Sequence, residues 1–178
     1  IEEDALEEVI TKVESEVGPI EVLVYNLGAQ TGMKLLSQTT HKEFEWGWRM
    51  ASFGLFRVAK ILCPIMAERG KGTFLVTSAT AAMRGNATQH SHAAAMGARR
   101  MLCQTLNDEF SIKGIHIVHA IIDGAVDAPD TLGKMLGSEA YEKLRKEVGL
   151  EKDGLILPEK IAESYLYLTC LLYTSDAA

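Results

Sequence analysis

Residues 72–101, GTFLVTSATAAMRGNATQHSHAAAMGARRM, decide the fold of this chain. The stretch begins as an apolar strand, continues through a turn of small residues, and ends in a helix that opens with two histidines. In proteins that alternate strands and helices, ligands bind in the crevice beyond the carboxyl ends of parallel strands. We therefore look for chemistry where this strand ends.

The rest of the chain continues the alternation of strands and helices. Apolar residues spaced three to four apart predict helices over residues 2–17, 41–69, 90–110, 139–148 and 157–168. Short apolar runs predict strands over residues 21–26, 73–78 and 115–123, and an irregular loop at residues 125–133 follows the third strand. Pro64 falls inside the second helix, so we expect a kink or a break there.

The connections between successive strands are longer than a dozen residues, which requires parallel strands joined by right-handed crossovers. The predicted fold class is therefore α/β, a Rossmann-like three-layer sandwich around a parallel sheet. A length of 178 residues is ordinary for one domain, and the sequence contains no internal repeat. We expect residues 1–170 to belong to a single domain.

Composition excludes several classes of partner. The net charge is −6 and the pI is near 5.4, so no basic surface for nucleic acid is expected. No apolar run approaches the roughly 20 residues of a membrane span, and the first residues are acidic, unlike a secretory signal. The three cysteines lie far apart among apolar residues, which favours reduced, buried thiols. These features predict a cytoplasmic protein without membrane contact.

Both ends of the sequence are unusual. Ile1 enters an amphipathic helix without a capping residue, and the final LLYTSDAA stops where a closing strand is expected. We therefore expect a fragment of a longer protein, in which residues 171–178 are a truncated or non-native tail.

Three strand-end segments resemble those of short-chain dehydrogenases/reductases. The first is 72–101 itself, and the second, LVYNLGA at 23–29, is similar to the family's Asn-Asn-Ala-Gly and keeps Asn26 and Gly28. The third, IIDGAVDAP at 121–129, is similar to its Pro-Gly-x-Val-x-Thr and keeps Gly124 and Val126. The resemblance spans residues 1–168 and implies the carboxyl-terminal portion of a Rossmann fold, without the amino-terminal βαβ units.

The resemblance also implies NAD or NADP as cofactor. In the family, Asn26, Gly28, Gly124 and Val126 would lie along the cofactor. The glycine-rich loop that holds the pyrophosphate belongs to the first strand of the fold, which has no match here. Gly28 and Gly32 do follow a strand, but without a third glycine they are a weak signal for a phosphate loop.

The family's four catalytic positions carry different residues in this chain. Placing the family's turn glycine on Gly85 puts His92 at the catalytic Tyr, Met96 at the Lys and Ala79 at the Ser, and counting three residues back from Gly54 puts Ala51 at the Asn. A thioether cannot lower the pKa of a neighbour as an ammonium does. An imidazole has an ordinary pKa of about 6.5 and can donate a proton at neutral pH without that help. His92 is thus the candidate proton donor, or else simply a polar residue at a helix start.

Two hydroxyls lie beside the position of the family's serine. In an unshifted register Ala79 points into the crevice and Ser78 points away, because side chains alternate along a strand. A one-residue bulge would bring Ser78 or Thr80 into place, and bulges are frequent near active sites. No metal site is expected, because His90 and His92 diverge on a helix and His116 and His119 face opposite sides of a strand.

The resemblance implies an NAD(P)-dependent oxidoreductase that transfers hydride to or from a small carbonyl or alcohol substrate. The alternative is a catalytically inactive Rossmann-fold binding or scaffold protein, favoured by the simultaneous loss of the four catalytic residues. A third possibility is an unrelated α/β domain that uses the loop at 123–124. The resemblance further implies a homo-oligomer formed through the helices near 41–69 and 90–110.

Overall fold

A computed structural model describes residues 3–28, 30, 32–149, 152 and 154–171. The chain separates into two compact units, residues 1–121 with 171–178, and residues 122–170. The tail at 172–178 lies outside the described residues, so the expectation of a non-native tail stays a prediction.

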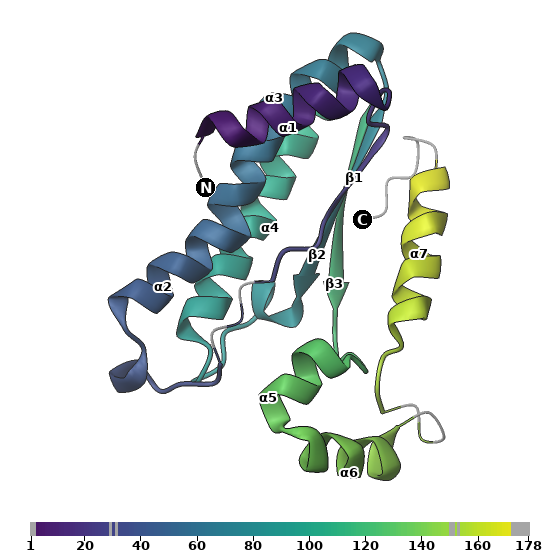
Figure 1. Cartoon of the computed structure of the whole chain (residues 1–178). Helices are drawn as coiled ribbons and strands as arrows, with labels where there is room; N and C mark the ends of the chain where they lie inside the picture. The colour runs from purple at the N-terminus through teal and green to yellow at the C-terminus, as the bar shows by residue number, and fades with distance from the viewer. Residues whose placement is uncertain (1–2, 29, 31, 150–151, 153, 172–178) are drawn as a thin grey trace. The chain divides into compact units, whose positions relative to one another are not determined.

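The first unit is built on a three-stranded sheet in the order β1-β2-β3. Its strands are β1 (Val22–Tyr25), β2 (Gly72–Ala79) and β3 (Ile115–Ile122). β1 and β2 are parallel, with Val22 opposite Thr73 and Tyr25 opposite Val76. The arrows of all three strands run the same way in Figure 1. The predicted parallel sheet is confirmed, and the carboxyl ends of its strands share one edge.

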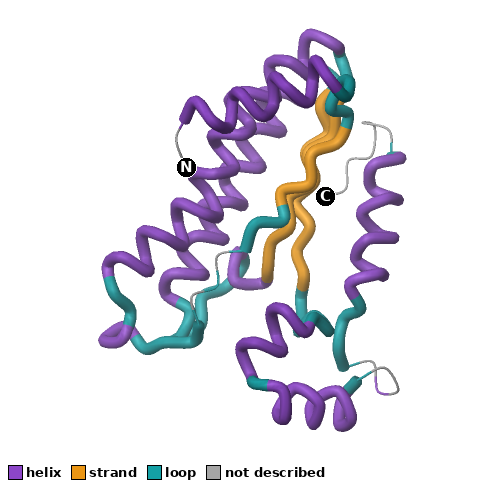
Figure 2. The backbone as a smooth tube through the Cα atoms, viewed as in Figure 1, coloured by secondary structure: helices purple, strands orange, loops and turns teal. Residues whose placement is uncertain are grey.

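Three helices of this unit pack on the same face of the sheet, as Figures 1 and 2 show. They are α1 (Glu3–Glu16), α3 (Gly54–Arg69) and α4 (His90–Phe110). Their apolar stripes meet the strands in one core that includes Ile10, Leu55, Leu62, Met66, Phe74, Val76, Leu106, Phe110 and Ile115. The predicted ranges of these elements agree with the structure to within a few residues.

The long helix before β2 contains an irregular turn. α2 (His41–Trp48) begins at a capping box in which Thr40 accepts the amide of Glu43, and it runs into a π-helical turn, η2 (Arg49–Phe53), and then α3. The helix continues through Pro64, so the expected break there is wrong. Pro64 and Lys60, whose carbonyl loses its amide partner, are both exposed, which leaves that carbonyl accessible to water.

Within the described residues, the continuous stretch His41–Arg69 is long and apolar enough to cross a membrane by length and composition. This differs from the expectation that no segment reaches that length. The core helix of a soluble protein passes the same test, and Leu55, Leu62 and Met66 of this stretch are fully buried against the sheet and its helices.

The second unit contains η5 (Pro129–Gly133), α5 (Lys134–Leu136), α6 (Ser138–Val148) and α7 (Pro158–Cys170). The segment expected to be an irregular loop is thus partly helical, because Pro129–Gly133 forms a π-helical turn. Val126 forms a parallel bridge with Ile156, so the chain after β3 is held beside the chain before α7. Three short 3-10 turns, η1 (Leu36–Gln38), η3 (Thr80–Ala82) and η4 (Ser111–Lys113), complete the first unit.

Candidate functional site

The carboxyl edge of the sheet presents the residues that follow β1 and β2. Asn26, Leu27 and Gly28 come directly after β1 and are all exposed. β2 ends at Ala79, and Thr80 opens the 3-10 turn η3. Because Tyr25 is opposite Val76 in a parallel pair, these two strand ends lie side by side. The structure thus brings the predicted cofactor residues of β1 to the same edge as Ser78 and Thr80.

Ser78 and Thr80 occupy different environments. Ser78 is buried, and its hydroxyl donates to the sulfur of Met96 on α4 over 3.7 Å. Thr80 is half-buried, and its carbonyl accepts the amides of Met83 at 2.9 Å and Arg84 at 3.1 Å. Ser78 therefore faces the helix that carries the candidate proton donor.

His92 lies in the first turn of α4 and is half-buried, with its Nδ1 atom shielded from solvent. Residues on either side of His90, where this helix begins, contact other segments of the chain. The hydroxyl of Ser91 donates a hydrogen bond to the carbonyl of Glu43 at 3.1 Å, and the backbones of Lys34 and Gln89 form an isolated parallel β-bridge. His92 therefore projects from a fixed helix start.

Three of the four residues that the sequence comparison matched to the family's catalytic positions belong to one apolar cluster. Ala51 and Met96 are buried there together with Ala81 and Ala95, and Ala79 packs against them. Neither the alanine methyls nor the thioether can transfer a proton. The side chains at these three positions therefore contribute to packing.

Sequence reasoning missed Arg99, which is only 2% exposed. Its guanidinium donates to the backbone carbonyls of Ala51, Thr77 and Leu27, so it joins η2, β2 and the end of β1. The signal was present in the helix periodicity. Positions 92, 96, 99, 103 and 106 alternate steps of four and three, which places Arg99 on the buried stripe of the helix.

The histidines on β3 are affected by burial. Desolvation lowers the pKa of His116, and it lowers the pKa of His119 with a further contribution from the positive charges of Arg100 and Arg99. Burial also raises the pKa values of Cys63 and Cys103 to about 12. Both thiols therefore stay protonated at neutral pH and are poor nucleophiles.

The second unit carries the other two predicted cofactor residues. Gly124 has a φ of +156°, and a side chain there would collide with Ile156. The backbone of Ile156 exchanges hydrogen bonds with Ala125 and Asp127 at 2.9 and 2.8 Å. Gly124 thus permits the close approach that places Val126 beside Ile156.

An ion-paired group supports the loop after Val126. The phenol of Tyr141 donates to Asp127 Oδ1 at 2.5 Å, and Arg145 Nε lies 3.1 Å from the same oxygen. The carboxylate of Asp127 raises the pKa of Tyr141, mainly by accepting its hydrogen bond. The group fastens α6 to the segment that follows β3.

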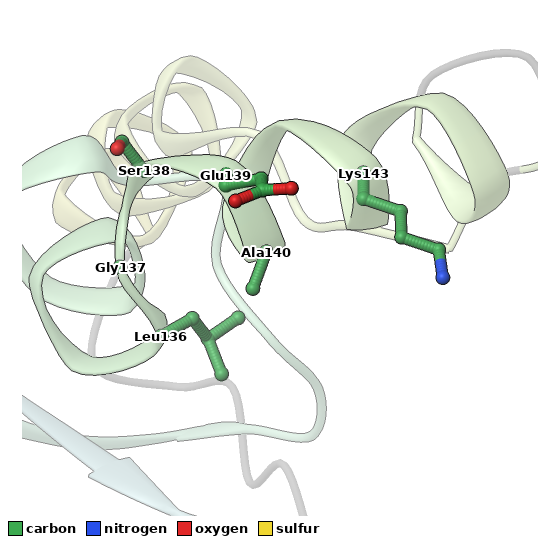
Figure 3. A pocket seen from close by; sticks show the side chains of 6 residues that line it. All are labelled: Leu136, Gly137, Ser138, Glu139, Ala140 and Lys143. Carbon is green, nitrogen blue, oxygen red and sulfur yellow. The ribbon is translucent and has the colours of Figure 1, made fainter.

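An open hollow lies at the start of α6. It is lined by Leu136, Gly137, Ser138, Glu139, Ala140 and Lys143 (Figure 3). In Figure 3 the Lys143 side chain extends away from Glu139, so the hollow does not gather its charged groups around one point. Among the described residues, no group of three or more His, Cys, Asp or Glu could hold a metal ion.

The fold and the strand-end residues define a Rossmann-like α/β protein, and comparisons with known proteins agree. A family model described as short chain dehydrogenase matches residues 1–135. The chain is 27% identical over 165 residues to a 3-oxoacyl-acyl-carrier-protein reductase of Thermotoga maritima, covering 93% of this chain and 65% of that protein.

Solved structures show the same fold. A 7α-hydroxysteroid dehydrogenase complexed with NADH and 7-oxo glycochenodeoxycholic acid matches with a TM-score of 0.79 at 24% identity, over 94% of this chain and 64% of that one. A gluconate 5-dehydrogenase from Burkholderia cenocepacia, in complex with NADP and tartrate, matches with a TM-score of 0.79 at 21% identity, over 98% and 66%.

The chain belongs to the short-chain dehydrogenase family, whose members are NAD(P)-dependent oxidoreductases. It spans slightly less than two thirds of the length of the relatives described above.

Proposed function

We propose that this chain is part of an oxidoreductase that uses NAD or NADP to transfer hydride to or from a small carbonyl or alcohol substrate. The observation that carries the proposal is the shared edge at the ends of β1 and β2, where Asn26 and Gly28 lie beside the end of the strand that contains Ser78. Family membership supports the same reaction class. We further propose that residues 1–170 are one portion of a single cytoplasmic Rossmann-like domain.

The residues present fit a dinucleotide at this edge. Asn26 and Gly28 are exposed, and the space around Gly28 is open, so a ligand can approach the backbone there. In the second unit, Gly124 and Val126 are the proposed cofactor residues. When bound, the nicotinamide would supply or accept the hydride.

His92 is the proposed proton donor to the substrate oxygen during carbonyl reduction. Its Nδ1 is buried, so Nε2 is the nitrogen proposed to hold the transferred proton. Reduction then consumes one hydride and one proton and yields the alcohol. Ser78 or Thr80 is proposed to orient the substrate carbonyl, and for Ser78 this requires its hydroxyl to exchange the weak sulfur acceptor of Met96 for the carbonyl oxygen.

Turnover of a panel of small ketones and alcohols with both dinucleotides tests this proposal. His92→Ala should lower turnover by about 100-fold or more, the usual contribution of a general acid, with cofactor binding retained. His90→Ala, two residues earlier at the helix start, is the matched control. Unchanged turnover in His92→Ala would remove the assignment.

A second candidate is a catalytically inactive dinucleotide-binding or scaffold protein. The apolar cluster that joins Ala51, Ala79 and Met96 supports it, because the three residues proposed to stand at catalytic positions of the family pack together and carry no group that transfers a proton. Dinucleotide binding without turnover across the whole panel would support this candidate. Cofactor-dependent oxidation or reduction of any panel member would exclude it.

We also propose a homo-oligomer formed through the helices near 41–69 and 90–110, without nucleic-acid or membrane partners. The support is an aromatic row on the first of these helical stretches, in which exposed Trp48 stacks on half-buried Phe53, and Phe53 stacks on exposed Phe56, with ring centroids 5.5 and 6.4 Å apart. Phe56→Glu should shift the species seen by analytical ultracentrifugation toward monomer, whereas Lys60→Glu, exposed one turn later, should not.

A further inference from the structure

Arg99 is the bulkiest of the fully buried side chains in the described part of the chain. Each of its three hydrogen bonds reaches a different element. Nε donates to the Ala51 carbonyl at 2.9 Å, Nη1 to Thr77 at 2.6 Å, and Nη2 to Leu27 at 2.7 Å. The guanidinium therefore spans the π turn and the carboxyl ends of two strands.

Packing alone does not account for an arginine at this position. Removing a charged group from water costs several kcal/mol, and an apolar side chain of similar volume would fill the space without that cost. Burial lowers the pKa of Arg99, while Tyr25 and Cys103 act in the opposite direction. A guanidinium nevertheless stays charged in proteins. Here its charge is stabilised by three carbonyl dipoles and by the face of the Tyr25 ring, 5.1 Å away.

Two of the three carbonyls that Arg99 contacts adjoin residues of the candidate site. Leu27 lies between Asn26 and Gly28, the proposed cofactor residues, and Thr77 immediately precedes Ser78. The bonds to Leu27 and Thr77 come from the two ends of one rigid, planar fork. The fork therefore fixes the spacing between the end of β1 and the end of β2.

Tyr25 supports the same arrangement. Its hydroxyl donates to the carbonyl of Met50 at 2.5 Å, next to the Ala51 carbonyl that Arg99 contacts. Arg99 and Tyr25 thus donate hydrogen bonds to two successive carbonyls of the helical turn and join it to the edge of the sheet.

We propose that Arg99 is a positioning residue of the cofactor edge, whose guanidinium holds residues 26–28 at a set spacing from the end of β2. It acts through the backbone beneath the ligand and does not touch the ligand itself. The inference rests on the proposed function, which assigns cofactor contacts to Asn26 and Gly28.

The test measures dissociation constants for NADH and NADPH in Arg99 variants of the whole oxidoreductase of which this chain is proposed to be part. Arg99→Ala should weaken binding about tenfold, equivalent to about 1.4 kcal/mol, and guanidinium ion far below denaturing concentration should restore it. Arg99→Met keeps most of the side-chain volume, but its dinucleotide binding should stay weak, because methionine lacks the guanidinium that donates the hydrogen bonds. Cys103→Ala, one turn along the same buried stripe, should lower stability and leave the dissociation constant unchanged.

Two outcomes with these variants would overturn the proposal. One is a dissociation constant for Arg99→Met that equals that of the wild type. The other is weakened binding by Cys103→Ala equal to that of Arg99→Ala, which would make the effect one of general stability.

A measurement on the wild type decides the matter if the Arg99 variants do not fold. Titration with NADH or NADPH should shift the side-chain Nε–H resonance of Arg99 in NMR spectra and leave that of exposed Arg84 in place. An unmoved Arg99 resonance at saturation would also refute the proposal.

If the wild type binds neither dinucleotide, it is the proposed function that fails. The positioning role of Arg99 is then tested by measuring amide hydrogen exchange in Arg99→Met. Faster exchange at Gly28 and Ser78 would support the positioning role, and unchanged exchange would refute it.

Discussion

The hydroxyl of Ser78 donates to the sulfur of Met96 over 3.7 Å, and both side chains are almost completely buried. This contact joins the end of β2 to Met96 of α4, which the sequence comparison matched to the family's catalytic lysine. Sulfur is a weak acceptor, so the bond holds the serine without the strength of an oxygen acceptor. The contact lies beside the apolar cluster of Ala51, Ala81 and Ala95.

Restoring the family's lysine should therefore destabilise the protein. Met96→Lys would place an ammonium in an apolar cluster, one helical turn before the positive charge of Arg99. We expect the free energy of unfolding in urea to fall by about 3 kcal/mol or more, without a gain in turnover. Met96→Leu should cost less than about 1.5 kcal/mol. Equal stability of Met96→Lys and Met96→Leu would contradict this view of the site.

Gly54 is required for space. Its φ of −61° suits any residue, and alanine would raise helix propensity by about 1 kcal/mol. A Cβ at this position, however, would collide with the hydroxyl of Tyr25, which is held by Met50 and lies under Arg99. We expect Gly54→Ala to destabilise the protein by about 1–3 kcal/mol, as overpacking does.

A double-mutant cycle checks the origin of that cost. Tyr25→Phe removes the colliding oxygen, so Gly54→Ala should cost clearly less in a Tyr25→Phe background. Strictly additive effects would show that the steric conflict is not with Tyr25.

Most of the fold was predictable because the regular spacing of apolar residues along the chain determines where helices and strands lie. The range predicted for α4, 90–110, is the range observed, and β1 and β2 are parallel as predicted. The π turn at Arg49–Phe53 was not predicted, since one extra residue in a turn hardly alters helical spacing. The break expected at Pro64 did not occur because the affected carbonyl is on the exposed side.

Stability should decrease on acidification below about pH 6.5, the ordinary histidine pKa. The pKa values of His116 and His119 are lowered in the folded state, so the unfolded chain takes up protons first as the pH falls. Their contribution to stability is complete above pH 6.5 and is lost as the pH falls through the folded pKa values.

Urea titrations at several pH values measure this dependence. His119→Asn should flatten the acidic slope, whereas substitution of exposed His41 at the start of α2 should not. An unchanged slope in His119→Asn would exclude His119 as a source.

The Tyr141 hydroxyl should hold α6 in place within its unit. Tyr141→Phe removes the donor to Asp127, and Asp127 keeps only its ion pair with Arg145. We expect faster amide hydrogen exchange over residues 127–149, because a short hydrogen bond to a carboxylate is lost. Tyr167→Phe on α7, where the side chain is 66% exposed, is the matched control. Equal exchange in the two variants would show that Asp127 and Arg145 suffice.

The candidate site was predictable only in part. Counting from Gly85 identified His92, Met96 and Ala79, and counting from Gly54 identified Ala51. The packing of Ala51, Ala79 and Met96 against one another depends on contacts between distant segments. Arg99 was not recognised, because a single charge on an apolar stripe does not reveal which carbonyls surround it. Only the fold brings Leu27, Ala51 and Thr77 around its guanidinium.

The bonds of Arg99 also bear on folding kinetics. They join positions 22, 48 and 72 residues apart in the chain, and closing such long loops is entropically costly before the core exists. We therefore expect these bonds to form after the transition state for folding. Loss of the guanidinium should then accelerate unfolding while changing the refolding rate little, which makes Arg99 a determinant of the lifetime of the native state.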